Sequence, residues 1–234
     1  MDPYVLKSLN AARKAREAAI AVTDLDDGRD RLVKAGDTVA GDLGVAIEAA
    51  FRSGKSGVVT AGGREFFLNV HVPPARLVIV GAVHISQVLA PMARMAGFDV
   101  TIIDPRTAFA TPERFEATEL VADWPQDVLE GRPLDRFTAL VAVTHDPKID
   151  DYPIEKALRT GCFYVGALGS RKTHARRVER LKAAGLGDDD IARIAAPIGL
   201  DIGAANPPEI AVAILAQVIA ALRRRDVSGE SAGQ

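Results

Sequence analysis

The chain has 234 residues, of which 48% are hydrophobic and 26% are charged, a composition typical of a globular protein. Its formal net charge of −2 provides no basic field for nucleic acid, and no uninterrupted apolar stretch approaches the roughly 18 residues of a membrane span. The single cysteine, Cys162, excludes an internal disulfide or a cysteine-rich metal site, and we expect no protein-held metal. Residues 1–17 are charged throughout and lack the apolar core of a signal peptide, which predicts a cytoplasmic protein.

The first 74 residues predict a small α+β segment. Its expected elements are two helices and a hairpin, over 4–22, 43–52, and 58–60 with 65–70. Asp27 and Gly28 form a turn after the first helix, and Gly62 and Gly63 connect the hairpin. The core of this segment would be thin, so we expect it to depend on contacts with the rest of the chain.

Strands and helices alternate over residues 75–224, which predicts an α/β domain with a parallel sheet covered by helices on both faces. The expected strands are 76–80, 99–103, 119–122, 138–143 and 162–166, and the expected helices are 84–96, 150–160, 171–184 and 208–224. Asn206 is placed to cap the last helix, which is apolar nearly all round and should be buried. Residues 225–234 predict a disordered tail.

The first strand of this domain leads into a turn that is similar to a dinucleotide-binding fingerprint. The turn has Gly81, Val83 and Ser86 where the fingerprint has Gly, Gly, and Gly or Ala. A valine at the second position crowds the approach of a pyrophosphate, which disfavours ordinary dinucleotide binding without excluding it. His84 opens the following helix, where it could face a ligand or pack at the helix start.

Two further strands end in charged residues. Asp104 and Arg106 could bind ribose hydroxyls and a phosphate, or they could pair with each other. His145 and Asp146 could supply a general base, a metal ligand or a hydrogen-bonding clamp. A turn at Asp146 and Pro147 explains the aspartate without a function but leaves the histidine unexplained. We therefore expect both side chains to face a ligand pocket.

The stretch GALGSRKTHARR repeats the theme of a strand, a glycine-rich turn and a helix. Gly169 and Ser170, followed by Arg171 and Lys172, predict a site for an anion such as phosphate at the start of the helix. The alternative is a basic helix face in water, which suits Arg176 and Arg177 better than the two earlier cations.

The stretch PIGLDIGAANPPEIA is almost free of charge and is rich in glycine and proline. It holds Gly199 and Asp201, and it leads into a helix start that carries Glu209. This composition indicates the lid or floor of a pocket. The predicted cofactor-binding residues are Gly81, His84, Asp104, Arg106, His145, Asp146, Gly169, Ser170, Arg171, Lys172, Gly199, Asp201 and Glu209.

The motifs GALGSRKTHARR, THDPKIDD and PIGLDIGAANPPEIAVAILAQVIA follow LVIVGAVHIS and IIDPRTAFATPERF in the chain. Together they resemble the XdhC/CoxI family, the accessory factors of xanthine dehydrogenase and aerobic carbon monoxide dehydrogenase, over about residues 28–224. The sequence departs from the family pattern in two places. Val83 stands where the family usually has glycine, and the N-terminal segment is shortened, without the usual glycine-serine and cysteine-bearing stretches.

The resemblance implies a Rossmann-type C-terminal domain and a role in maturing molybdenum hydroxylases. Family members bind the molybdenum cofactor, a molybdopterin that carries a phosphate and often a nucleotide, and they deliver it to the apoenzyme. We therefore expect a non-catalytic, cofactor-binding chaperone. The expected partners are an apo molybdenum hydroxylase, a cysteine desulfurase and a second copy of the chain in a homodimer. The alternative is an NAD(P)-dependent oxidoreductase or another nucleotide-binding enzyme, which Val83 disfavours.

Overall fold

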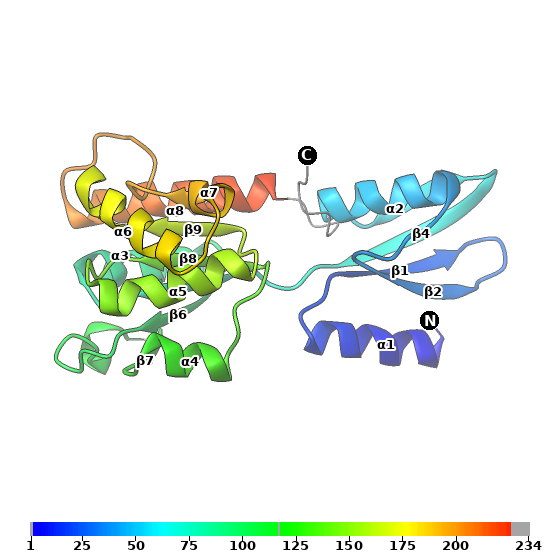
Figure 1. The fold of residues 1–234 in the computed structure, drawn as a ribbon. Helices are drawn as coiled ribbons and strands as arrows, with labels where there is room; N and C mark the ends of the chain where they lie inside the picture. Colours follow the sequence, from blue (N-terminus) through cyan, green and yellow to red (C-terminus); the bar gives the residue numbers. More distant parts are fainter. Residues whose placement is uncertain (1, 117, 226–234) are drawn as a thin grey trace. The chain divides into compact units, whose positions relative to one another are not determined.

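The computed structural model describes residues 2–116 and 118–225, and Figure 1 shows the course of the chain. The chain divides into two compact units, one of which ends at Pro73 while the other runs from Pro74 to Arg224. The tail predicted from residue 226 onward lies outside the described residues. No helix within 2–116 or 118–225 is long and apolar enough to cross a membrane.

The first unit is an antiparallel sheet with two helices. Its elements are α1 (Pro3–Lys14), β1 (Ala19–Asp24), β2 (Asp30–Lys34), α2 (Gly41–Ser53), β3 (Gly57–Ala61) and β4 (Arg64–His71). The strand order is β2-β1-β4-β3. Gly62 and Gly63 both have positive φ, as a two-residue hairpin turn between β3 and β4 requires. The predicted hairpin is therefore confirmed.

The helix predicted over 4–22 is wrong in its second half. Helix α1 ends at Lys14, and Ala19–Asp24 forms β1, the strand that pairs with both β2 and β4. Residues 19–22 are buried on both faces of the sheet, and such a continuous run of small and β-branched residues has no strand-like alternation in the sequence. Its strand identity comes from pairing with two neighbours that lie further along the chain.

The second unit contains a six-stranded parallel sheet. Its strands are β5 (Arg76–Val80), β6 (Asp99–Ile103), β7 (Glu119–Val121), β8 (Thr138–Ala142), β9 (Tyr164–Ala167) and β10 (Ile194–Ala195). The helices are α3 (His84–Met95), the 3-10 turn η1 (Pro112–Arg114), α4 (Pro125–Gly131), α5 (Pro147–Arg159), α6 (Arg171–Ala183), α7 (Asp188–Ala192) and α8 (Pro207–Arg224). The strand order β7-β6-β5-β8-β9-β10 is that of a Rossmann fold.

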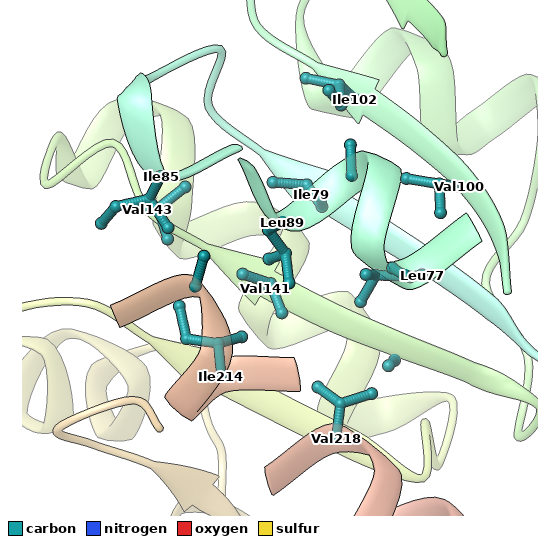
Figure 2. Close-up of a cluster of buried hydrophobic side chains, with 14 of the residues drawn as sticks. Leu77, Ile79, Ile85, Leu89, Val100, Ile102, Val141, Val143, Ile214 and Val218 are labelled. Atoms are coloured by element: carbon teal, nitrogen blue, oxygen red, sulfur yellow. The ribbon is translucent and has the colours of Figure 1, made fainter. Parts of the chain in front are cut away.

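Strands β5 and β8 lie side by side at the centre of the sheet and are buried on both faces. Leu77, Ile79 and Val141 pack on one face against residues of α3 and α8, such as Leu89 and Ile214 (Figure 2). The alternate residues of the same strands pack on the other face against residues of α4, α5 and α6. The predicted α/β sheet with helices on both faces is therefore confirmed.

Several predicted details of this unit need correction. Helix α5 begins at Pro147 instead of residue 150, because Asp146 caps it and proline is favoured in the first turn. The short elements α4, α7 and β10 have no counterpart among the predicted elements. Helix α8 buries one side, and Val212 is about half exposed, so the helix is not buried all round.

Candidate functional site

The carboxyl ends of β5 and β8 adjoin at the point where the strand order of the sheet reverses. In such folds, ligands bind in the crevice beside this point. Gly81, directly after β5, has φ +121°, and an added Cβ would lie 2.9 Å from Cγ2 of Thr144, which follows β8. The hydroxyl of the buried Ser86 donates to the Gly81 carbonyl at 2.5 Å. The two loops are thus in contact, and a glycine is required between them.

Asp104, after β6, is fully buried. It accepts hydrogen bonds from the Ala82 amide at 2.7 Å and from the amide and guanidinium of Arg106 at 2.8–2.9 Å. Burial raises the pKa of Asp104, but these hydrogen bonds outweigh it and lower the pKa overall. The carboxylate therefore fixes the turn after β5, and both of its oxygens already accept hydrogen bonds from the protein.

Arg106 is the ion-pair partner of Asp104. Its hydrogen bond to Asp104 raises its pKa, and the charges of Asp150 and Asp146 raise it further. Its guanidinium also lies over the ring of Phe109, 4.7 Å from the centroid. The mutual salt bridge that the sequence allowed is therefore present.

Arg114 is a structural contributor that the sequence reasoning missed. Its Nη1 donates to the carbonyls of Phe109 at 2.7 Å and Ala82 at 3.2 Å, and its Nη2 donates to Gln87 at 3.2 Å. It therefore ties the segment after β6 to the turn after β5. Its place in a short 3-10 turn gives no periodic signal that could have revealed this role.

The polar residues of the loop after β8 differ in their partners and in their exposure. Asp146 accepts a hydrogen bond from the Lys148 amide at 3.0 Å and caps α5, so its carboxylate has a structural partner. His145 is exposed and has φ +64°, a rare conformation for a residue other than glycine. The hydroxyl of Thr144 donates to Asp150 Oδ1 at 2.7 Å and accepts from the Asp146 amide at 3.0 Å.

The loop after β9 leads into the start of α6. Gly169 has φ +141°, and the Ser170 hydroxyl accepts from the Thr173 amide at 3.2 Å as the helix N-cap. Arg171 and Lys172 are exposed in the first turn, which contains no acidic residue. Neither side chain has an ion-pair partner within 2–116 and 118–225. Cations at the positive end of a helix are unfavourable, and a bound anion would relieve this repulsion.

Asp150 and Arg177 are two further buried charged residues near these loops, and neither was among the predicted site residues. Their exposed fractions are 1% and 2%. The expectation that Arg177 lies on a solvent-facing helix surface is therefore wrong, although Arg176 is exposed. Helix α6 packs against α5, and the one-residue step from position 176 turns Arg177 inward. Burial raises the pKa of Asp150 to about 6.

The segment before α8 is fixed by hydrogen bonds of its own. Asn206 and Glu209 form a reciprocal cap: the Glu209 amide donates to Asn206 at 3.0 Å, and Glu209 accepts from Asn206 and from the Ala205 amide at 2.7 Å. The amide of Gly199 donates to Gln217 at 2.8 Å. Asp201 is exposed. Among the predicted site residues, Glu209 therefore holds the loop, and its contacts stay within the segment.

The structure brings the loops after β5, β6, β8 and β9 to one edge of the sheet. Within the described ranges, no cluster of three or more His, Cys, Asp or Glu residues could hold a metal ion. Fold and site together define a Rossmann-type domain whose candidate ligand-binding loops lie at the carboxyl edge of the sheet. Residues 77–218 match the XdhC Rossmann domain family, and the chain belongs to that family.

Three curated proteins are similar to parts of this chain. YqeB, an uncharacterized protein of Escherichia coli K12, is 30% identical over 163 residues, which are 68% of this chain and 29% of YqeB. A protein of Bacillus subtilis 168, named as a probable subunit of xanthine dehydrogenase, is 33% identical over 159 residues, 68% of this chain and 46% of that protein. PaoD of Escherichia coli K12, a molybdenum cofactor insertion chaperone, is 28% identical over 146 residues, 62% of this chain and 40% of PaoD.

The chain thus spans less than half the length of each of these relatives. Among solved structures, the chain is similar to a protein described as a xanthine dehydrogenase from Bacillus halodurans, with a TM-score of 0.63 and 23% identity. The match covers 96% of this chain and 66% of that one. At this level of identity, the similarity shows the fold.

Proposed function

We propose that this protein binds the molybdenum cofactor and takes part in maturing a molybdenum hydroxylase of the xanthine dehydrogenase type. Membership of the XdhC Rossmann domain family supports the proposal. So do the names of two relatives, one a molybdenum cofactor insertion chaperone and the other a probable subunit of xanthine dehydrogenase. The role is that of a binding and delivery protein, which needs an anion site and a partner surface.

The observation that carries the proposal is the start of α6. Arg171 and Lys172 lie in its first turn, which has no acidic residue, at the carboxyl edge of the sheet. Molybdopterin carries a phosphate, and helix amides with two adjacent cations match that group. These residues would hold the phosphate, and the bound cofactor would supply the molybdenum that the client enzyme uses.

A nicotinamide dinucleotide fits the crevice less well. The acid that would bind its ribose, Asp104, has both oxygens occupied by Arg106 and the Ala82 amide. Val83 occupies the N-cap position of α3 and packs against the apolar cluster, at the place where dinucleotide-binding turns use glycine. An NAD(P)-dependent oxidoreductase is therefore the second candidate, supported by the strand order alone.

We extend the proposal to the remaining residues and partners. His84 and His145, both exposed beside the crevice loops, would contact the pterin side of the ligand. Gly199 and Asp201 would contribute through the segment before α8. The partners would be the apo molybdenum hydroxylase and a cysteine desulfurase in the cytoplasm, with a homodimer as the assembly. The cofactor would be molybdopterin, with or without an attached nucleotide.

The test compares two double variants of α6. Arg171→Ala with Lys172→Ala should weaken the binding of phosphate and of molybdopterin by about tenfold or more, because each charge-assisted contact contributes about 1.5–3 kcal/mol. Arg176→Ala with Lys182→Ala removes the same charge from exposed positions further along α6 and should leave affinity nearly unchanged. Binding is measured by calorimetry, with NAD(H) titrated in parallel. Equal affinities for the wild type and the first variant, or tight NAD(H) binding, would overturn the proposal.

A further inference from the structure

Asp150 and Arg177 are two buried groups of opposite charge, on the helices that follow the loops after β8 and β9. Asp150 stands in the first turn of α5, and its Oδ1 accepts a hydrogen bond from the Thr144 hydroxyl at 2.7 Å. Arg177 stands in the second turn of α6, and its Nη2 donates to the Leu168 carbonyl at 3.2 Å. Asp150 Oδ2 and Arg177 Nε and Nη1 are buried without a hydrogen-bond partner among the residues that the structure describes.

Such a group is costly unless its members compensate each other. An isolated buried charge strongly destabilises a fold, and a guanidinium cannot escape this cost by losing its proton. The positive charge of Arg177 lowers the pKa of Asp150, opposing the larger effect of burial. The negative charges of Asp150 and Asp151 likewise oppose the effect of burial on the pKa of Arg177. The two opposite charges thus offset part of the cost of burial by electrostatic attraction, without a direct hydrogen bond between the two side chains.

Each of the two residues is bonded to a different loop of the candidate site, Asp150 through Thr144 and Arg177 through Leu168. Thr144 contacts the turn at Gly81 through its methyl group and Asp150 through its hydroxyl. Arg177 then reaches the carbonyl of Leu168, which precedes the predicted anion site. The amide of Leu168 donates to the Ala142 carbonyl at 2.8 Å, so the loop after β9 is held from both sides.

We propose that Asp150 and Arg177 are a positioning pair that fixes the loop at 168–170, and with it the anion site at the start of α6, relative to the loop after β8. Neither side chain is exposed enough to bind the anion itself. Their effect acts through the backbone of the loop and the direction of the α6 amides. The consequence for ligand affinity rests on the proposed function, whereas the effect on the loop does not.

The chain offers a matched control on the same two helices. Asp151 and Arg180 form an ion pair between α5 and α6, with Arg180 Nη2 3.1 Å from Asp151 Oδ1. This pair is partly exposed, and Arg180 also donates to the Arg176 carbonyl within α6. Substituting Asp151 and Arg180 removes one negative and one positive charge from α5 and α6, as substituting Asp150 and Arg177 does. The hydrogen bond from Arg177 to the Leu168 carbonyl is kept in these control variants.

The first measurement is amide hydrogen exchange of the full-length protein without ligand. Arg177→Met and Asp150→Asn should each accelerate exchange at the amides of Leu168, Thr173 and His174 by about tenfold or more, because loosening the loop opens local hydrogen bonds. Arg180→Met and Asp151→Asn should not. Unchanged exchange in Arg177→Met, or equal acceleration in Arg180→Met, would overturn the proposal.

The second measurement is a double-mutant cycle in phosphate affinity. If the two residues had a purely structural role, their single losses of affinity would add up in the double variant. Asp150→Asn and Arg177→Met should be strongly non-additive, and Asp151→Asn and Arg180→Met additive. Additive losses in the first cycle would refute a positioning role. If the wild type binds no phosphate, the proposed function fails and exchange alone decides on the pair. If Arg177→Met does not fold, Thr144→Val replaces it, and unchanged exchange at Leu168 in that variant would overturn the proposal.

Discussion

The raised pKa of Asp150 makes a sharp prediction for folding stability as a function of pH. Burial raises this pKa from its ordinary value of 3.8 to about 6 in the folded protein. Below pH 3.8 the carboxyl group is protonated in both states. Between pH 4 and pH 6 it is ionised in the unfolded chain alone, so the free energy of unfolding falls as the pH rises. Above pH 6 this contribution is constant.

The size of the effect follows from the same numbers. A rise from 3.8 to about 6, at about 1.4 kcal/mol for each pH unit, corresponds to about 3 kcal/mol of stability lost between pH 4 and pH 7. Asp150→Asn removes the titration and keeps the hydrogen-bond acceptor for Thr144. The difference in unfolding free energy, wild type minus variant, should therefore fall across this range.

The assay is urea unfolding at half-unit steps from pH 4 to pH 7.5, at constant ionic strength. The variant leaves the buried Arg177 without its carboxylate, which adds an offset in absolute stability between the two proteins. The test therefore depends on how the difference in unfolding free energy changes with pH, and the constant offset does not affect it. A difference that stays constant, or that rises with pH, would show that Asp150 is ionised normally in the folded state and would refute the reasoning.

Two further substitutions test the turn after β5. Gly81→Ala should lower the free energy of unfolding by about 2–4 kcal/mol, measured by thermal or urea unfolding. The φ of +121° is unfavourable for alanine, and the new Cβ would lie 2.9 Å from Cγ2 of Thr144. A loss below about 0.5 kcal/mol would contradict this packing. Asp104→Asn should lower the free energy of unfolding at pH 7. This difference from the wild type should become smaller as the pH falls below about 4, because a carboxylate with a lowered pKa stabilises the fold while it is ionised and loses that contribution on protonation. A difference that does not change with pH would count against an ionised Asp104.

Much of the second unit can be predicted from the sequence because its signals are local. The strands at 76–80 and 99–103 are rich in aliphatic residues and are followed directly by Gly81 and Asp104, and both have the predicted bounds. Asn206 and Glu209 have the spacing of a reciprocal cap, and they form one. In each case the residues that give the signal are close together in the sequence, so the element can be predicted without knowledge of the fold.

The identity of β1 and the burial of Arg177 were decided by tertiary structure. Residues 19–22 become a strand because β2 and β4 pair with them from both sides, and Arg177 becomes a core residue because α5 covers it with Asp150. The strand β4 and the helix α5 lie far along the chain from the residues that they cover, so the sequence near Arg177 does not distinguish it from the exposed Arg176. Likewise, the sequence places Asp104 and Arg106 at a strand end, but only the folded turn at Ala82 shows that their charges are directed at each other and at the backbone.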